Sequence, residues 1–102
     1  MTPSVKLLKG VVTLFDSQNQ PLFTLPLGGI VHVNYNQRFI SVVCDAGRCS
    51  LFDIQGNFLR FFFARDVRSS RLLGNQQIEL HRDHGRIERR TLDDRLLGVT
   101  HR

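Results

Sequence analysis

Two cysteines are the first residues whose types and spacing suggest chemistry. Cys44 and Cys49 flank a turn of sequence Asp-Ala-Gly-Arg at residues 45–48. In a two-residue hairpin, the two thiols would face each other at a position where opposed side chains come closest. This arrangement predicts a cross-strand disulfide or a thiol pair for a soft metal. The alternative, which we favour, is a pair of reduced cysteines packed as small hydrophobes, the usual state in the cytosol.

The other residues suited to metal binding or catalysis do not form a recognisable site. A zinc ion would need two ligands beyond the cysteines, and the neighbouring sequence does not supply them. His81 and His84 are three residues apart, which places them on opposite faces of a strand. The chain has no Gly-x-Ser-x-Gly motif and no glycine loop suited to phosphate. We therefore expect no enzyme activity, no metal, no cofactor and no small-molecule ligand.

The segment at residues 58–63, Phe-Leu-Arg-Phe-Phe-Phe, is the most unusual local feature. Consecutive side chains on a strand point to opposite faces, so one apolar side of this segment needs a cover. The cover is the protein's own core, a subunit interface or a stacked base, and exposed contiguous aromatics favour an interface over a bare surface. The candidate interface residues are Phe58, Phe61, Phe62 and Phe63.

The charge of the chain allows an acidic partner. The formal net charge is +5 over 102 residues, which suits contact with nucleic acid or an acidic protein. In a nucleic-acid-binding protein, arginines near the phenylalanines would neutralise phosphates. The candidates for that role are Arg60, Arg65, Arg68 and Arg71. Acidic residues are interleaved with these arginines, a pattern more typical of a solvated, self-paired surface.

The elements that carry these residues are short strands separated by turn signals. Apolar runs of strand length alternate with Gly, Asn and Asp clusters, as in residues 31–36 and 77–81. Residues 39–44 are apolar on both faces, which predicts a strand covered on both sides. The polar strand at residues 86–90 looks like a protected outer edge. The chain is therefore predicted to be a single all-β domain spanning residues 1–102, an antiparallel meander of hairpins.

A degenerate internal repeat accompanies the hairpins. A basic residue followed by two bulky apolar residues begins at each of Lys6, Arg38, Arg71 and Arg95. We interpret these as three repeats starting near residues 6, 38 and 71, with a truncated fourth near residue 95.

From Ile30 to Phe63, the order of strands and turns resembles one blade of a β-propeller of the WD40 or NHL type. The family's Trp-Asp mark is absent, since the chain has no tryptophan. The resemblance implies that several subunits assemble to close a ring, because a propeller generally needs four or more blades. A small sandwich or a partly open barrel of the same hairpins is the alternative fold.

The C-terminal segment has two possible conformations. Thr91 and Asp94 have the spacing of a helix N-terminus and Gly98 could end that helix, which predicts a short helix. The match of Arg95 to Arg71 favours a strand there instead.

Neither a leader-like apolar stretch nor a run of membrane-spanning length occurs, so we expect a cytoplasmic protein without membrane contact. The hypothesis from sequence is a non-enzymatic assembly or protein-interaction module. It would associate with itself or with another protein through the segment at residues 58–63 or an exposed strand edge. The alternative is a small basic nucleic-acid-binding protein.

Overall fold

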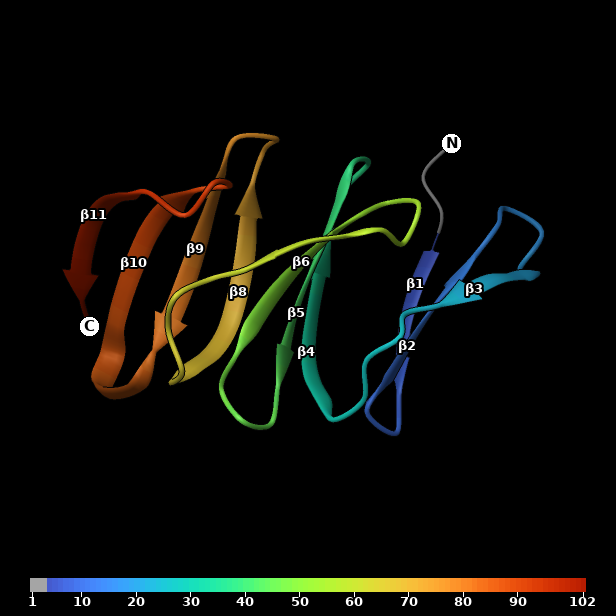
Figure 1. The fold of residues 1–102 in the computed structure, drawn as a ribbon, viewed down its shortest axis with the longest axis horizontal. Coiled ribbons are helices and arrows are strands. Elements are labelled where there is room, and N and C mark those ends of the chain that lie inside the picture. Colours follow the sequence, from blue (N-terminus) through green and yellow to red (C-terminus); the bar gives the residue numbers. More distant parts are fainter. Residues whose placement is uncertain (1–3) are drawn as a thin grey trace.

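Three antiparallel sheets lie side by side along the molecule in the computed structural model, which describes residues 4–102 (Figure 1). The first sheet contains β1 (Ser4–Leu8), β2 (Val11–Phe15) and β3 (Pro21–Thr24). The second contains β4 (Ile30–Tyr35), β5 (Phe39–Cys44), β6 (Cys49–Asp53) and β7 (Phe58–Phe61). The third contains β8 (Val67–Leu73), β9 (Gln77–Arg82), β10 (Arg86–Thr91) and β11 (Leu96–His101). Within each sheet every strand pairs with the next one along the chain, which confirms the predicted all-β meander.

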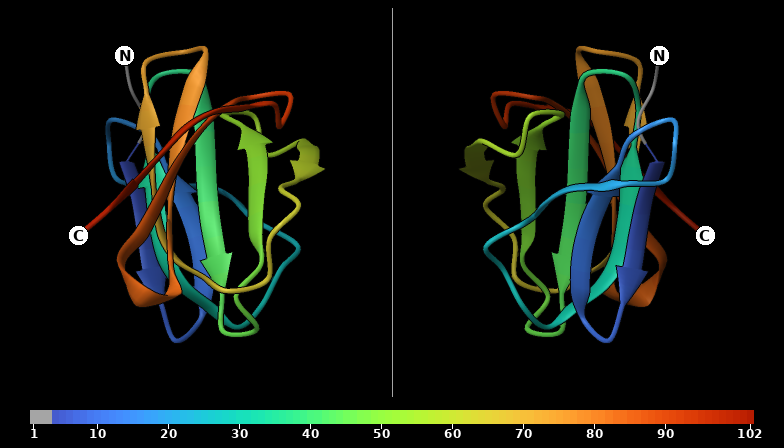
Figure 2. Two further views of the ribbon diagram at one scale, coloured as in Figure 1. Left: turned by 90° about the vertical axis from the view of Figure 1, so that its left-hand side faces the viewer. Right: turned by 90° about the vertical axis from the view of Figure 1, so that its right-hand side faces the viewer.

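The first and third sheets form the two ends of the molecule, and the second sheet lies between them (Figure 1, Figure 2). The principal extents are 41 × 26 × 21 Å. The three sheets are separate and do not join into a closed barrel, and their arrangement is the predicted propeller-blade one.

Two apolar clusters hold the three sheets together. Val12 and Leu14 of the first sheet pack with Ile40 and Val42 of β5, and all four are 0% exposed. On the other side, Val43 of the same strand packs in a cluster with residues of the third sheet. β5 is therefore buried on both faces, as predicted from its continuous apolar run, and each fully buried aliphatic side chain contributes roughly 1.5–3 kcal/mol to folding.

Equivalent turns link each sheet to the chain that follows it. The carbonyl oxygen of Gly10 accepts a hydrogen bond from the N–H of Ile30 at 3.0 Å, and that of Gly47 accepts one from Val67 at 2.9 Å. The carbonyl oxygen of Gly85 accepts one from Arg102 at 3.0 Å. These turns make β1, β5 and β9 equivalent to one another. Because β5 and β9 each pair with a preceding strand, β4 and β8, the first sheet has no counterpart of that strand among residues 4–102.

The basic residues that open the sequence repeat lie at unlike places in these sheets. Lys6 lies in β1 and Arg71 in β8, whereas Arg38 precedes β5 and Arg95 precedes β11. The repeat boundaries near residues 6, 38, 71 and 95 therefore stay a prediction.

The C-terminal segment forms a hairpin, so the short helix predicted as one alternative for Thr91–Gly98 is wrong. The N–H of Thr91 donates to the carbonyl oxygen of Arg95 at 2.8 Å, and the Thr91 hydroxyl accepts from the Arg95 N–H at 2.9 Å. These bonds close a tight turn between β10 and β11, where Asp94 has a φ of 72°. The helical segment of residues 4–102 is the 3-10 turn at Asp83–Gly85, and no helix there is long and apolar enough to cross a membrane.

Candidate interaction surfaces

The four candidate phenylalanines have different environments. Phe62 is 2% exposed and belongs to the cluster between the second and third sheets, so it is a core residue and not an interface residue. Phe63 is 90% exposed, while Phe58 and Phe61 are about half exposed. Phe61 and Phe63 are therefore on the uncovered side and Phe62 on the covered side, as alternation predicts. Phe58 joins the uncovered side because the pairing of β6 with β7 is irregular between Leu51 and Phe52.

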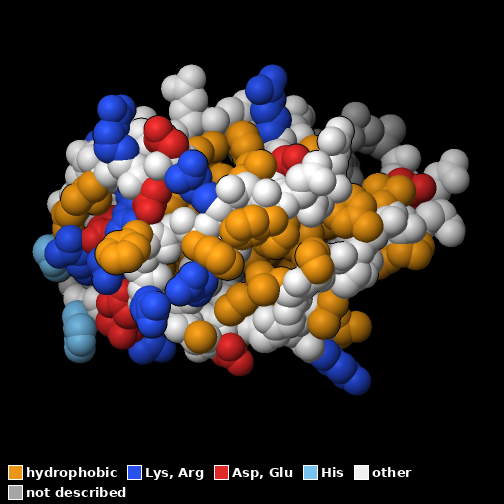
Figure 3. All heavy atoms as spheres, in the orientation of Figure 1, with side chains coloured by type: hydrophobic (Ala, Val, Ile, Leu, Met, Phe, Trp, Pro, Cys, Tyr) orange, Lys and Arg blue, Asp and Glu red, His pale blue; other side chains and the backbone are white. Residues whose placement is uncertain are grey.

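Phe58 and Phe61 form an exposed aromatic surface. Their ring centroids lie 4.8 Å apart, and Phe58 also meets Phe52 edge-on at 5.6 Å. Pro26 and Leu27 lie beside these rings around a shallow hollow of about 170 Å³. Hydrophobic side chains gather across the middle of the face seen in Figure 3. We call Phe58, Phe61, Phe63, Pro26 and Leu27 the phenylalanine surface.

The four arginines proposed for nucleic acid separate into two pairs. Arg68 forms an ion pair with Asp83, and Arg71 lies 3.3 Å from a carboxylate oxygen of Glu79. Arg60 and Arg65 have no carboxylate within ion-pair distance in residues 4–102. The structure therefore does not bring the four guanidinium groups together as one free basic track.

A buried carboxylate organises the arginines of the third sheet. Glu88 is 2% exposed, and it accepts hydrogen bonds from Arg82 at 3.0 Å, Arg86 at 2.6 Å and Arg90 at 3.1 Å. Arg82 also donates to Asp66 at 2.5 Å, and Arg90 to Asp94 at 2.6 Å. Burial alone would raise the pKa of Glu88, but the hydrogen bonds from Arg90, Arg86 and Arg82 outweigh it and lower that pKa to about 2.

The sequence does not predict this network, because the polar residues 86–90 indicate an outer edge strand. β10 in fact lies between β9 and β11. Glu88 pairs across the sheet with Leu80, and Arg90 pairs with Ile78. Leu80 and Ile78 are fully buried, so their cross-strand partners lie on the same covered face. One signal for this burial was available in the sequence. Residues 86–90 follow a strand whose apolar residues alternate, and pairing with that strand places Glu88 and Arg90 opposite Leu80 and Ile78.

A basic pocket lies beside the network, next to the segment at residues 61–65. Its volume is about 510 Å³, and its lining includes the side chains of Arg48, Arg65, Arg82, Arg90 and Phe61. The guanidinium of Arg48 lies over the ring of Phe61, 4.5 Å from the centroid. We call this the arginine pocket.

The two cysteines do not face each other, so the hairpin register expected from the sequence is wrong. Val43 pairs with Cys49, and the N–H of Cys44 donates to the carbonyl oxygen of Arg48 at 3.0 Å. Cys44 packs towards the first sheet and Cys49 in the cluster towards the third, and both thiols are free. Burial raises the pKa of Cys49 to about 12. Residues 4–102 contain no cluster of three or more His, Cys, Asp or Glu side chains arranged for a metal.

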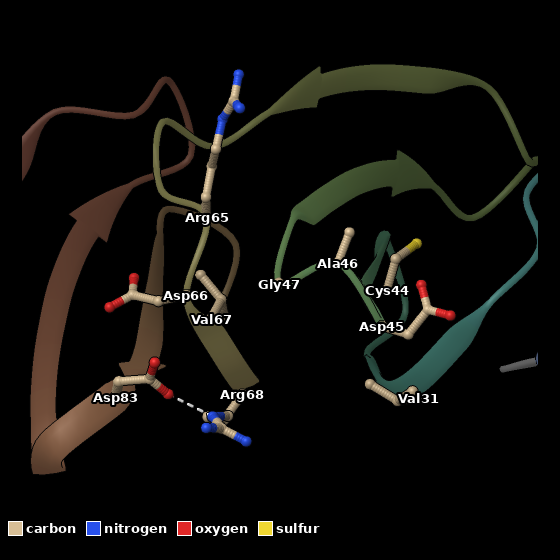
Figure 4. Close-up of a pocket in the computed structure, with 10 residues that line it drawn as sticks. All are labelled: Val31, Cys44, Asp45, Ala46, Gly47, Arg65, Asp66, Val67, Arg68 and Asp83. Carbon is tan, nitrogen blue, oxygen red and sulfur yellow. Dashed lines mark hydrogen bonds and ion pairs between the residues drawn. The ribbon is translucent and has the colours of Figure 1, made fainter.

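A larger hollow of about 590 Å³ lies between the Asp45–Gly47 turn and β8 (Figure 4). Arg68 and Asp83 are joined on one side of it, while Cys44 and Asp45 point away on the other. The side chain of Arg65 is directed away from the hollow. The charged residues that line the hollow are of both signs, and no lining nucleophile is paired with a base.

Solved structures with the same arrangement of sheets include two β-propeller domains and a designed protein. The WD40 domain of Neurospora crassa Pan2 matches with a TM-score of 0.74 and 9% identity, over 99% of this chain and 33% of that one. The β-propeller domain of Myceliophteria thermophila Cps50 (Swd1) matches with a TM-score of 0.71 and 16% identity, over 97% and 34%. The computationally designed Ika8 protein matches with a TM-score of 0.66 and 13% identity, over 87% and 32%.

These likenesses show the fold, and they confirm the resemblance of the sequence to a WD40-type blade. The chain spans about a third of the length of these solved chains. The sequence matches no protein-family model and no curated protein.

Proposed function

We propose that this chain is a non-enzymatic assembly module that binds protein, and that copies of it associate through the outer side of the first sheet. The observation that carries the proposal is the open edge of β1. Its equivalents β5 and β9 each pair with a further strand, whereas β1 pairs with β2 alone among residues 4–102. An unpaired edge presents backbone N–H and C=O groups that pair readily with a strand of another chain.

The outer face of the first sheet supports the same proposal. Val12 and Leu14 point towards the second sheet, so Leu8, Val11 and Leu22 lie on the opposite face. Leu8 is 72% exposed, Val11 39% and Leu22 54%. The second sheet is covered on both faces by its neighbours, so a second copy seated on this outer face would repeat a contact already present within the chain.

Nucleic acid is the second candidate partner. Arg60 and Arg65, without carboxylate partners in residues 4–102, favour it, while the ion pairs of Arg68 and Arg71 oppose it. Base stacking would fall to Phe63, which is 90% exposed.

The experiment is size-exclusion chromatography with light scattering at low and high salt, with absorbance followed at 260 and 280 nm. We expect a protein-only species whose mass is a multiple of 11.7 kDa and survives high salt. The double variant Leu8→Lys with Leu22→Lys should fall to the monomer mass, because it places charge on the outer face of the first sheet.

The matched control is Phe63→Lys, which changes an even more exposed apolar side chain on another surface. Loss of assembly in this control alone would show that the copies associate through the phenylalanine surface and not through the first sheet. A wild-type monomer would refute self-association, and loss of 260 nm absorbance as salt rises would favour nucleic acid.

A further inference from the structure

The arginine pocket has a basic wall of four arginines, and the chain's own carboxylates neutralise only two of them, Arg82 and Arg90. Arg48, Arg65, Arg82 and Arg90 line it, and none of its lining residues is acidic. Glu88, Asp66 and Asp94 are bonded to Arg82 and Arg90 without belonging to that lining, so they fix these two guanidinium groups in place. A positive site whose side chains are already held in position needs little reorganisation to bind an anion.

Arg48 and Arg65 supply the free hydrogen-bond donors. Neither has a carboxylate within ion-pair distance in the described part of the chain. Arg48 is held over the ring of Phe61, which restrains its guanidinium without using its N–H groups. A carboxylate entering the pocket could therefore form charge-assisted hydrogen bonds with both arginines.

The rest of the pocket is apolar and aromatic. Phe61 and Phe63 line it, and Phe61 also lines the hollow of the phenylalanine surface. A ligand that reaches both places must carry an anionic group next to an apolar side chain. A polypeptide segment with an acidic residue beside a large hydrophobic one has this chemistry.

The neighbouring charges favour such a peptide over a nucleic acid strand. A strand carries a phosphate at every nucleotide and is followed by an extended basic groove. Of the candidate arginines beyond the pocket, Arg68 and Arg71 are occupied by Asp83 and Glu79, and Arg60 alone has no carboxylate partner in residues 4–102. The free arginines of the pocket, Arg48 and Arg65, are therefore not continued by a basic groove through Arg68 and Arg71.

We propose that the arginine pocket binds an acidic peptide segment of a partner protein, with a carboxylate held by Arg48 and Arg65 and a neighbouring hydrophobic side chain on Phe61 and Phe63. This contact does not require the chain to self-associate, because the outer face of the first sheet takes no part in it.

The test is fluorescence anisotropy with the full chain and a short labelled peptide in which Asp and Glu alternate with Leu and Phe. We expect binding that weakens as salt rises. Arg65→Glu should raise the Kd about tenfold, as should Arg48→Glu, since each removes one charge-assisted contact and adds a like charge. Arg65→Gln should raise it less than Arg65→Glu. The matched control is Arg38→Glu, which makes the same charge change at an exposed arginine before β5 and should leave the Kd unchanged.

Three outcomes would overturn the proposal. The first is equal binding of the same peptide with Asn and Gln in place of its acids. The second is an equal loss in Arg38→Glu and in Arg65→Glu, which would show a general effect of net charge. The third is binding of labelled oligouridine that depends on Arg65 while the acidic peptide does not bind. Circular dichroism of each variant verifies its fold, and the light-scattering mass tests self-association separately.

Discussion

The side chain of Asn34 on β4 accepts a hydrogen bond from the backbone N–H of Leu72 on β8, at 2.6 Å. On the same strand, the Nδ2 group of Asn36 donates to the carbonyl oxygen of Gly74 at 3.0 Å. Polar side chains of one sheet therefore satisfy backbone groups along the inner edge strand of the next. The polar face of residues 32–36 is thus a contact between two sheets rather than a solvated face.

Replacing Asn34 should weaken this contact between the second and third sheets. In Asn34→Ala the N–H of Leu72 loses its acceptor while it stays half-buried, so we expect a loss of about 1–3 kcal/mol in the free energy of unfolding. Urea denaturation of wild type and variant measures it. Asn75→Ala, at an exposed turn residue, is the control and should change that free energy by less than about 0.5 kcal/mol. Equal effects of the two variants would contradict the role of Asn34.

Glu88 should make the chain sensitive to acid. Because its pKa in the folded chain is about 2, below the ordinary 4.5, its contribution is present above the ordinary pKa and is lost as pH falls towards the folded value. We expect Glu88→Gln to destabilise the chain by about 3 kcal/mol near neutral pH, since it leaves the buried Arg90 and the partly exposed Arg82 and Arg86 without their shared carboxylate. Urea denaturation at several pH values should show the difference from wild type shrinking between about pH 5 and pH 2.

Glu79→Gln is the control for this experiment. Hydrogen bonds from His81 and Arg71 also lower the pKa of Glu79, but this carboxylate is more exposed than that of Glu88. Its replacement should therefore cost less at neutral pH. A Glu88→Gln variant as stable as wild type at neutral pH would show that the network adds nothing to folding.

The sequence predicted the strands well and this network poorly, for a physical reason. A run such as residues 39–44 has one interpretation, because apolar side chains on both faces require cover on both faces. In residues 86–90 the covered face carries Glu88 and Arg90, and charged side chains normally indicate a solvent-exposed face. The burial of Glu88 follows from three arginines converging on it, and that convergence appears only once the strands are paired.

The interface residues show a similar limit. Alternation places Phe62 opposite Phe61 and Phe63, but it does not say which face another sheet will cover. That choice follows from the third sheet, whose Ile78 and Leu80 share the cluster with Phe62. The predicted hairpin register at Cys44 and Cys49 is wrong for a related reason. The loop between the two strands contains one residue more than the predicted two-residue loop, which shifts the pairing.

The core position of Phe62 gives a clear contrast with its neighbour. Phe62→Ala should lower the free energy of unfolding by about 3–5 kcal/mol, because it leaves a cavity between two sheets. Phe63→Ala should change it by less than about 0.5 kcal/mol, since that ring is 90% exposed. Thermal and urea denaturation of the two variants measure the difference. Similar destabilisation by both would contradict the burial of Phe62.

The two thiols should be reduced and unequal. We expect two reactive thiols per chain under denaturing, non-reducing conditions, since Cys44 and Cys49 are both free. In the native chain Cys44 should react with a thiol reagent first, because Cys49 is 0% exposed and burial raises its pKa to about 12. Comparing Cys44→Ser with Cys49→Ser assigns each rate to its residue. A chain with no reactive thiol after denaturation would instead contain a disulfide.

Gly47 should be among the least replaceable residues of the fold. Its φ of 84° is unfavourable for a side chain, and an added Cβ would lie 2.0 Å from the carbonyl oxygen of Arg65. Gly74 has a similar φ of 69°, but nothing lies within 4 Å of its added Cβ. Gly74→Ala should therefore cost about 1 kcal/mol for the backbone conformation alone. Gly47→Ala should cost several times more, because the link from Gly47 to Val67 joins the second sheet to the third. Urea denaturation of the pair separates the two effects, and equal losses would show that the close approach at Arg65 is relieved without disturbing the contact between the sheets.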